Sequence, residues 1–393
     1  MDIDQLSRSP IGSLVPIHGR DARFGEFAYF SFLAEPLPDD ILGLSSSTWT
    51  RVAEASAALA KLDQACLQLP DPRLLIRPTL WREALDTSAL EGTVGTLREL
   101  LEAQLPSAQF ISPETVEIRA YERVALQAFE EIKHRDISVS LLCSLQNQLF
   151  RDDASNKPLD LGRVRQNHVW IGDEKLPIQE SRFVPAPGDD RLQLGMSNWE
   201  AWVQANHSHL PPVLRAALAH YQFETLHPFG DGNGRVGRLV IVLQLLKAGA
   251  IQHPAITVSA WFLRRRIEYQ DHLLAVSASG DWNPWIQFFC QAISEQCARL
   301  IPSADRLVLW VSEARRKLVE KRWHGAIHGL LESLTEWPVI TIADTAAQHG
   351  VSVMNATRMV NHLVEIGVLE ELTGRSHNRM FGATEVMRTV DSV

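Results

Sequence analysis

The sequence lacks long apolar runs. No segment approaches the roughly 18 consecutive apolar residues that a membrane-spanning helix needs, although 45% of its 393 residues are hydrophobic. The first residues, MDIDQLSRSPIGSLVP, have neither the basic start nor the apolar stretch of a secretory signal. These absences predict a cytoplasmic globular chain, long enough for two or three domains and without a membrane partner.

Cysteine and positive charge are also scarce. The cysteines form no C-x-x-C pair, which argues against disulfides and a zinc knuckle and favours buried free thiols; they are Cys66, Cys143, Cys290 and Cys297. The formal net charge is −9, so no general basic field would attract nucleic acid. Any nucleic-acid binding would have to be local.

Helical spacing of apolar residues dominates what is present. Expected helices cover 44–69, 81–105 with interruptions at Gly92 and Gly95, 113–137, 196–226, 235–248, 258–279, 284–300 and a long connecting stretch at 303–333. Two β-prone runs, HVWIG at 168–172 and SRFVP at 181–185, predict a hairpin. The fold class is therefore mainly α with a small β-hairpin.

Residues 227–238 read HPFGDGNGRVGR, and the glycines in them match the G-x-G-x-x-G fingerprint of dinucleotide-binding proteins. That fingerprint requires a strand before its first glycine and an acidic residue about 20 positions later. The preceding residues 211–226 have a helical period instead, and no Asp or Glu occurs from Arg238 to Ile267. The stretch is therefore not a Rossmann turn.

A helix–loop–helix explains the same stretch better. Glycine-flanked amides at 232–234 would form an anion nest at the start of the second helix. Arg235 and Arg238 would project from one side of that helix, where guanidinium groups suit phosphate oxygens. Asp231 is a hard carboxylate suited to Mg²⁺ beside phosphates, and His227 can accept a proton near neutral pH. This combination predicts attack on a nucleotide phosphate.

With every specified position present, HPFGDGNGRVGR resembles the Fic family signature HPFx(D/E)GNGRxxR. The resemblance implies a Fic-type helical core with a β-hairpin flap at 110–302, between an N-terminal helical region at 1–109 and a linker helix with a winged helix-turn-helix at 303–393. It also implies transfer of AMP from Mg·ATP to a Ser, Thr or Tyr hydroxyl of a target protein, with self-modification.

The same resemblance assigns roles to the residues of the motif. His227 would deprotonate the target hydroxyl, and Asp231 would bind Mg²⁺. The α-phosphate would lie in the cradle of Gly232, Asn233 and Gly234, and the β- and γ-phosphates would lie on Arg235 and Arg238. Glu224, just upstream, is expected on a solvated helix face, with orientation of a neighbouring residue as the alternative.

A second motif, TSALEG at 87–92, is similar to the family's inhibitory pattern (S/T)xxxE(G/N). By this resemblance Glu91 would pair with Arg238 and place negative charge where the γ-phosphate should lie, so that ATP binds unproductively. Family members with this arrangement also remove AMP from targets. The direction that dominates in this chain stays open.

The predicted hairpin resembles the Fic flap, which pairs with an extended target segment through backbone groups. Its residues here are Val169, Trp170, Ile171 and Gly172, and Trp170 either covers the core or faces the target. On the adenosine side, Tyr269 occupies the family's aromatic position for ATP binding, while Gln270 stands where many members have a second tyrosine.

The tail from about 338 resembles a winged helix, with helices at 342–349 and 353–366 and a hairpin at 368–381. DNA contacts would come from Ser352, Asn355, Thr357 and Arg358 on the recognition helix and from Arg375 and Arg379 on the wing. Residues 335–393 contain four Lys or Arg and seven Asp or Glu, a net charge of −3. DNA binding, protein binding and homodimerisation therefore remain alternatives for the tail. A nucleotide-sensing DNA-binding regulator is the competing function for the whole chain.

Overall fold

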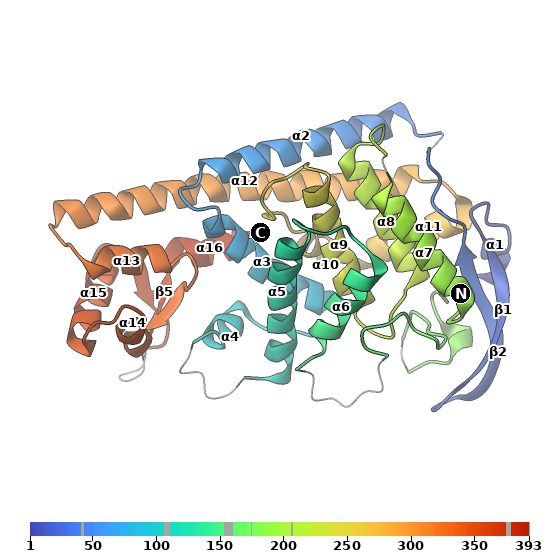
Figure 1. The fold of residues 1–393 in the computed structure, drawn as a ribbon, viewed down its shortest axis with the longest axis horizontal. Coiled ribbons are helices and arrows are strands. Elements are labelled where there is room, and N and C mark those ends of the chain that lie inside the picture. Colours follow the sequence, from blue (N-terminus) through green and yellow to red (C-terminus); the bar gives the residue numbers. More distant parts are fainter. Residues whose placement is uncertain are drawn as a thin grey trace. The chain divides into compact units, whose positions relative to one another are not determined.

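The computed structural model describes residues 1–40, 43–105, 111–152, 160–173, 175–205, 207–374 and 379–392. Helices dominate this part of the chain, and the strands form two small antiparallel sheets (Figure 1). The mainly α fold class is confirmed. The expected domain boundary between residues 109 and 110 falls within 106–110, outside the described residues, and so does Arg375.

The chain divides into two compact units. The first consists of Met1–Ala57, Arg123–Ala250 and Trp261–Ser294, and the second of Ala58–Glu122, Ile251–Ala260 and Glu295–Val393. Four of the five divisions fall within helices, α2 (Ser46–Gln68), α5 (Pro113–Glu131), α10 (Ser259–Arg264) and α12 (Asn283–Glu320), and the fifth lies in the connection at Ala250–Ile251. Each unit is therefore assembled from segments that lie far apart in the sequence.

The first unit is built around two buried helices, α8 (Pro212–Leu226) and α9 (Asn233–Lys247). Nearly all residues of both helices are buried, so neither has a distinct polar face. The remaining elements of this unit are α1 (Ile3–Leu6), α6 (Val139–Leu149), the 3₁₀ turn η1 (Ile178–Glu180), α7 (Asp190–Gln204) and α11 (Arg266–Ser279). Trp199 of α7 and Trp285 of α12 each donate from Nε1 to a carbonyl of α8, at 2.9 Å.

The first unit also contains a β-hairpin for which the sequence analysis had no expectation. Strands β1 (Gly12–Asp21) and β2 (Gly25–Ala34) pair along their whole length. The turn between them is stabilised by Asp21, whose carboxylate accepts from the backbone N–H groups of Arg23 and Phe24. Phe32 of β2 then donates to the carbonyl of Val184, at 2.9 Å. The hairpin is thus hydrogen-bonded to the run at 181–185, one of the two runs that were expected to form the flap.

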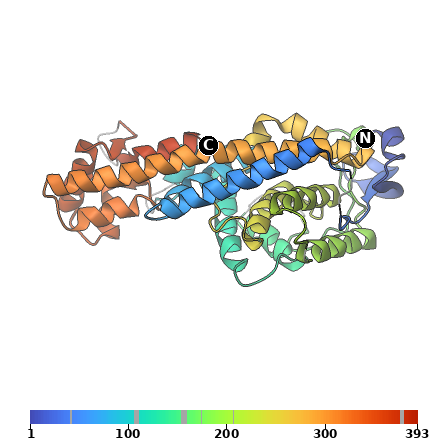
Figure 2. The same ribbon diagram turned by 90° about the horizontal axis from the view of Figure 1, so that it is seen from above.

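Helices α2 and α12 run side by side in the same direction, as the blue and orange helices in Figure 2 show. In the first unit Thr48 donates to Asn283 at 2.7 Å and accepts from Gln287 at 2.8 Å. α12 continues through Pro302 and ends at Glu320, followed by Arg322 and Gly325, which both have positive φ. The expected break between 300 and 303 is therefore wrong, because buried residues on both sides of Pro302 keep the helix packed.

The second unit contains α3 (Arg73–Leu90), α4 (Leu97–Glu102), α13 (Ala326–Ser333), α14 (Ile342–Gln348), α15 (Val353–Glu365) and α16 (Thr384–Ser392). A three-stranded antiparallel sheet has the order β3 (Val339–Thr341), β5 (Met380–Ala383), β4 (Leu369–Glu371). The helices expected at 342–349 and 353–366 and the pairing expected at 368–381 are confirmed. The helix expected near 81–105 begins earlier, at Arg73, and breaks after Leu90.

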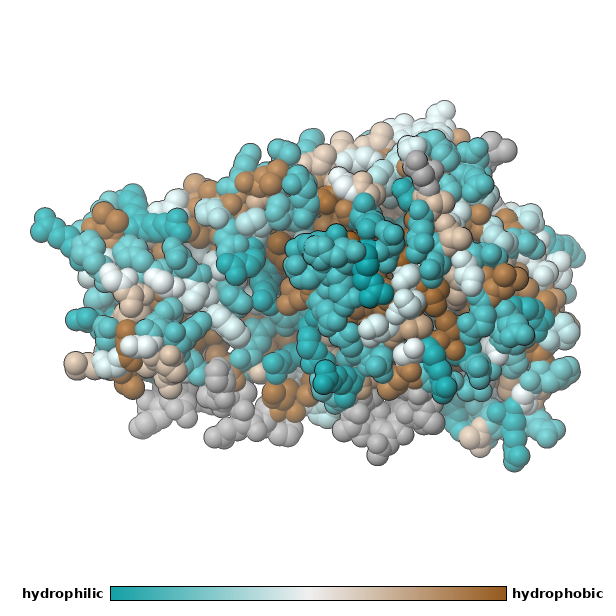
Figure 3. Space-filling model, viewed as in Figure 1, coloured by the Kyte–Doolittle hydropathy of each residue, from teal (hydrophilic) through white to brown (hydrophobic). Residues whose placement is uncertain are grey.

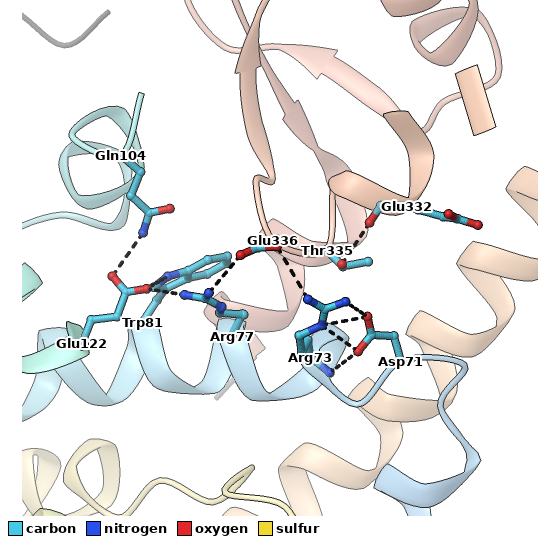
Figure 4. Close-up of polar contacts among 9 residues, drawn as sticks. All are labelled: Asp71, Arg73, Arg77, Trp81, Gln104, Glu122, Glu332, Thr335 and Glu336. Atoms are coloured by element: carbon cyan, nitrogen blue, oxygen red, sulfur yellow. Dashed lines mark hydrogen bonds and ion pairs between the residues drawn. The ribbon is translucent and has the colours of Figure 1, made fainter. Parts of the chain in front are cut away.

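A polar network anchors α3 within the second unit (Figure 4). The buried carboxylate of Glu122 on α5 accepts from Trp81 Nε1 at 2.9 Å and from Arg77 at 3.2 Å. Burial raises the pKa of Glu122, while the bond from Trp81 and the charge of Arg77 oppose this rise. Arg77 and Arg73 also pair with Glu336, which follows α13, at 3.3 and 3.6 Å. α16 packs against the same helix.

Three of the four cysteines, Cys66, Cys290 and Cys297, are buried as expected, and Cys143 is partly exposed; all four are free. Burial raises the pKa of each buried thiol to about 12. In the part of the chain that the structure describes, no helix has the length and apolar character needed to cross a membrane. The face drawn in Figure 3 is mostly hydrophilic, with apolar residues in small groups.

Candidate functional site

The residues of the HPFGDGNGRVGR motif form the loop between α8 and α9 and the first turns of α9. α8 ends at His227, whose backbone is left-handed with φ 52° and ψ 62°. α9 begins after Gly232, which also has a positive φ, of 87°. His227 and Arg322 are the non-glycine residues with positive φ among those described. Such a conformation costs on the order of 1 kcal/mol or more outside glycine, so surrounding contacts must impose it.

Arg165 supplies these contacts for His227. Its guanidinium is almost fully buried and donates to four carbonyls: those of Asn167, Ala186, Leu226 and His227. The bond to His227 O is 2.8 Å long, and the backbone N–H of Arg165 donates to Pro228 O at 2.9 Å. Burial lowers the pKa of Arg165 to about 9, which leaves the group charged near neutral pH. Arg165 therefore fixes the backbone that carries His227.

Asn233 fixes the opposite side of the loop. Its side-chain Oδ1 accepts from the backbone N–H of Phe229, and its Nδ2 donates to the carbonyl of the same residue, both at 2.8 Å. Phe229 is fully buried and packs in the core below the loop. The bidentate bond closes the loop over five residues and directs the chain into α9.

Asp231 lies at the rim of the loop, with a side chain that is 35% exposed. Its backbone carbonyl accepts from the buried Gln146 of α6 at 3.2 Å, and its carboxylate is 3.5 Å from Arg235. A Cβ on Gly232 would lie 3.0 Å from the ring of Phe150. Glycine is therefore required at this position by both its positive φ and the close approach of Phe150.

Arg235 and Arg238 are the cations of the site, and each is 2% exposed. The guanidinium of Arg235 lies 4.9 Å above the ring of Phe150, an arrangement that holds a planar cation in place. Both residues lie in the first turns of α9, where the helix dipole and its N–H groups add positive potential. The site therefore combines a buried positive charge with an exposed carboxylate, Asp231, at its edge.

Tyr269 of α11 is 5% exposed, and its ring stacks on Phe262 with centroids 4.5 Å apart. Its hydroxyl is 2.7 Å from Nε2 of His220, and Nδ1 of His220 is 3.1 Å from Gly237 O on α9. This chain of bonds joins α11 to α9. Tyr269 thus lies in the core, and the neighbouring Gln270 is partly exposed.

The expected flap residues lie at the N-terminal hairpin. Ile171 forms a single antiparallel bridge with Phe183 in place of the expected pair of strands, and the neighbouring Val184 accepts a bond from β2. Trp170 is partly buried and packs edge-on against Phe27 of β2, with centroids 6.1 Å apart. Val169 is partly exposed and Gly172 is exposed. The hairpin β1–β2 therefore covers part of the flap.

The TSALEG motif forms the C-terminal end of α3. Glu91 is the exposed C-cap, and Gly92 follows with φ 99°. The N–H of Gly92 donates to Ala89 O, and that of Thr93 to Ser88 O. This pattern is a Schellman cap, which requires a left-handed residue after the helix. The glycine of the motif thus ends the helix at Glu91, while Thr87 is fully buried one turn earlier.

The tail residues that were candidates for DNA contacts bond within their own helix. Ser352 caps α15 through Asn355, Thr357 donates to Val353 O, and Arg358 donates to Asn355 Oδ1 at 2.8 Å. Arg379 lies 3.5 Å from Glu371. The helix also exposes Val353 and Met354, at 63% and 82%.

The site fits one Mg²⁺ bound together with phosphates. Within the described ranges, no group of three or more His, Cys, Asp or Glu residues could hold a metal ion. Mg²⁺ commonly uses one or two carboxylates and completes its shell with waters and substrate phosphates. The partly exposed carboxylate of Asp231 beside an anion-binding helix end suits that mode. Chemically, the site can hold a polyphosphate and accept a proton at His227.

Sequence reasoning missed Arg165, Gln146 and His220, which hold the site together, and it placed Glu224 wrongly. The side chain of Glu224 is 11% exposed and does not lie on a solvated face. The sequence places Gly162-x-x-Arg165 just before the flap residues, which draws attention to Arg165. Its four carbonyl partners are revealed only by the fold. His220 and Gln146 gave no local signal, because their partners are distant in the sequence.

Two family models match the chain: one described as "Fic/DOC family N-terminal" at residues 49–130, and one described as "Fic/DOC family" at 136–245. The chain is 36% identical over 132 residues to "Protein adenylyltransferase Fic" of Drosophila melanogaster, which is 33% of this chain and 23% of that protein. The match to the protein of the same name from Culex quinquefasciatus has the same extent. The chain thus spans about a quarter of the length of these relatives.

Solved structures show the same fold. A Fic family protein from Desulfovibrio desulfuricans G20 aligns with a TM-score of 0.56 at 20% identity, over 88% of this chain and 98% of that one. Residues 134–508 of Fic-1 from C. elegans align with a TM-score of 0.50 at 20% identity, over 66% and 74% of the two chains.

The pH dependence of stability tests the role of His220. Burial and the charge of Arg238 lower the pKa of His220 to about 3, whereas an unfolded histidine titrates near about 6.5. Because the folded pKa is the lower one, the stability from His220 is present above about pH 6.5 and is lost as the pH falls towards about 3. The free energy of unfolding should therefore decrease less steeply with falling pH in His220→Gln than in wild type, by up to about 1.4 kcal/mol per pH unit.

Denaturant unfolding between about pH 7 and pH 4.5 measures the effect. The exposed His324→Gln should leave the wild-type slope unchanged. Parallel pH profiles for wild type and His220→Gln would contradict a neutral, buried His220.

Proposed function

We propose that this chain is a member of the Fic family and a nucleotidyltransferase that moves AMP from ATP to a hydroxyl group of a protein. The observation that carries this proposal is the loop between α8 and α9. One short, rigidly bonded segment presents a histidine, an exposed carboxylate and the start of a helix with two buried arginines. These are the groups that transfer of a phosphoryl-linked nucleotide requires.

In the proposed reaction, His227 accepts the proton of the target hydroxyl. The hydroxyl oxygen forms a bond to the α-phosphorus of ATP, the bond from that phosphorus to the bridging oxygen breaks, and pyrophosphate leaves with the electron pair. The N–H groups of residues 232–234 hold the α-phosphate, and Arg235 and Arg238 hold the β- and γ-phosphates. Mg²⁺ on Asp231 would neutralise phosphate charge when bound.

The target is proposed to be an extended protein segment that pairs with the flap at 169–172. Backbone pairing demands little of the target sequence, which is why the flap specifies a geometry and no particular target. Tyr269 and Gln270 are proposed for the adenosine side. The burial of Tyr269 favours support of the pocket wall through His220 over direct stacking on the base.

We also propose that Glu91 inhibits the enzyme by pairing with Arg238. The Schellman cap at Gly92 supports this role, because it ends α3 at a fixed residue and so defines where Glu91 lies on the helix end. A carboxylate on Arg238 would remove one phosphate ligand and repel the γ-phosphate. Removal of AMP from a target, with Glu91 positioning water, is the alternative use of the same residues.

For the C-terminal region we propose a winged helix that binds protein. The exposed Val353 and Met354 and the net charge of −3 over residues 335–393 favour this role over the DNA-binding regulator considered above.

The function is tested by His227→Ala. This change removes the proposed base and none of the phosphate ligands, so we expect AMP transfer to fall by about 10²–10⁴-fold while ATP affinity stays near the wild-type value. Labelled ATP with Mg²⁺ reports transfer to the chain itself, and calorimetry reports binding. The exposed His209→Ala serves as the matched control and should transfer AMP normally. Wild-type transfer by His227→Ala would overturn the assignment.

The inhibitory role is tested by Glu91→Gly. We expect weak self-labelling by wild type and strong labelling by this variant, because Arg238 becomes available to phosphate. Adding Arg238→Ala should reverse the gain, and this non-additivity is the signature of two residues in one network. Glu102→Gly, at the end of α4, is the control and should label like wild type. Equal labelling by wild type and Glu91→Gly at saturating ATP would refute the inhibitory role but not the transfer reaction.

A further inference from the structure

We propose that Glu224 is a positioning residue for His227: its carbonyl selects the ring nitrogen that acts as the base, and its carboxylate stabilises the imidazolium formed when that nitrogen takes a proton. The inference rests on the proposed function, since it takes His227 as the base. It adds a residue that the pattern HPFx(D/E)GNGRxxR does not include.

The backbone of Glu224 orients the imidazole ring. Nδ1 of His227 lies 3.3 Å from the carbonyl oxygen of Glu224. A carbonyl can only accept a hydrogen bond, so this contact requires the proton of the neutral ring to be on Nδ1. Nε2 then carries the lone pair. The nitrogen that can accept the target's proton in this tautomer is therefore Nε2, on the side of the ring away from Glu224.

The side chain of Glu224 approaches the same nitrogen. Its Oε2 is 4.0 Å from Nδ1 of His227, and the two side chains are 11% and 21% exposed. When Nε2 accepts the proton from the target, the ring becomes a cation with its Nδ1–H facing this carboxylate. An opposite charge at this distance, away from bulk water, favours the charged ring. This arrangement parallels the carboxylate that supports the histidine of a hydrolase triad.

Gly237 provides the space for the carboxylate. A Cβ at this position would lie 2.5 Å from Oε1 of Glu224 and 2.9 Å from the ring of Phe223. Gly237 occupies an unspecified position of the pattern, two residues after Arg235. Glu224 and Gly237 thus make a close contact in this chain at two positions that the pattern leaves unspecified.

The surrounding charges make such a carboxylate necessary. Arg165 donates to the carbonyl of His227, and Arg235 and Arg238 are buried on the adjoining α9. These guanidinium groups oppose a positive charge on the ring, while Asp231, at the rim of the loop, favours it. Glu224 lies at ion-pair distance from the ring, 4.0 Å from Nδ1.

The test compares Glu224→Gln with Glu130→Gln, an exposed glutamate paired with Lys133, in full-length chains that carry Glu91→Gly. Self-labelling with Mg·ATP is measured across pH. We expect Glu224→Gln to lower the plateau rate by about tenfold or more and to move the acid limb of the profile down by about one pH unit or more. Glu130→Gln should change neither. An unchanged acid limb and rate in Glu224→Gln would overturn the proposal.

A second measurement does not depend on turnover. The titration of His227 is followed by NMR of histidine-labelled protein without nucleotide, and its signal is assigned by its loss in His227→Ala. The midpoint should fall in Glu224→Gln, and an unchanged midpoint would overturn the proposal even if the variant were inactive. Full transfer by His227→Ala would instead refute the proposed function, while the titration would still report whether the two residues are coupled.

Discussion

The candidate site depends on how the backbone from His227 to Asn233 is held. Its residues 227–232 have no regular secondary structure, and their conformation is imposed by two side chains outside them: Arg165, on the carbonyls at the start, and Asn233, on both polar groups of Phe229. A hydrogen bond to a charged group contributes about 1.5–3 kcal/mol, and a buried polar group left without its partner costs about 1–3 kcal/mol. Together such terms exceed the cost of the left-handed His227, so the loop can be rigid without being helical.

This rigidity has a direct chemical consequence. An anion cradle made of backbone N–H groups works only if those groups already point in one direction, because any reorganisation would be subtracted from the binding energy. The same constraint fixes the ring of His227 relative to Glu224 and places the two buried arginines at the start of α9. In the second unit, α3 is held near both of its ends. The network around Glu122 holds its first turns, as Figure 4 shows, and the cap at Gly92 ends it.

The sequence predicted the parts of this site that are local. The course of α2 and α9, the loop at 227–232 and the break after Leu90 follow from apolar spacing and glycine placement over short stretches. The N-terminal hairpin was not predicted, although its strands are consecutive; its contact with the flap, from Phe32 to Val184, joins distant segments and has no local signal. For the same reason the role of Arg165 could not be predicted, since its carbonyl partners lie at Asn167, Ala186, Leu226 and His227. Glu224 was placed on a solvated face because a helix pattern alone does not reveal that Gly237 leaves room for its carboxylate.

The central claim is that Asn233 holds the loop in the form that binds ATP. Its direct test is the affinity for Mg·ATP, measured by calorimetry on wild type, Asn233→Ala and Asn283→Ala, at a temperature where all three are folded. Asn283 makes a similar set of bonds, to Ser45 and Thr48, outside the loop. Asn233→Ala keeps its backbone N–H but loses both bonds to Phe229, so its affinity should fall by about tenfold or more, while Asn283→Ala should bind as wild type does. Wild-type affinity in a folded Asn233→Ala protein would contradict the account.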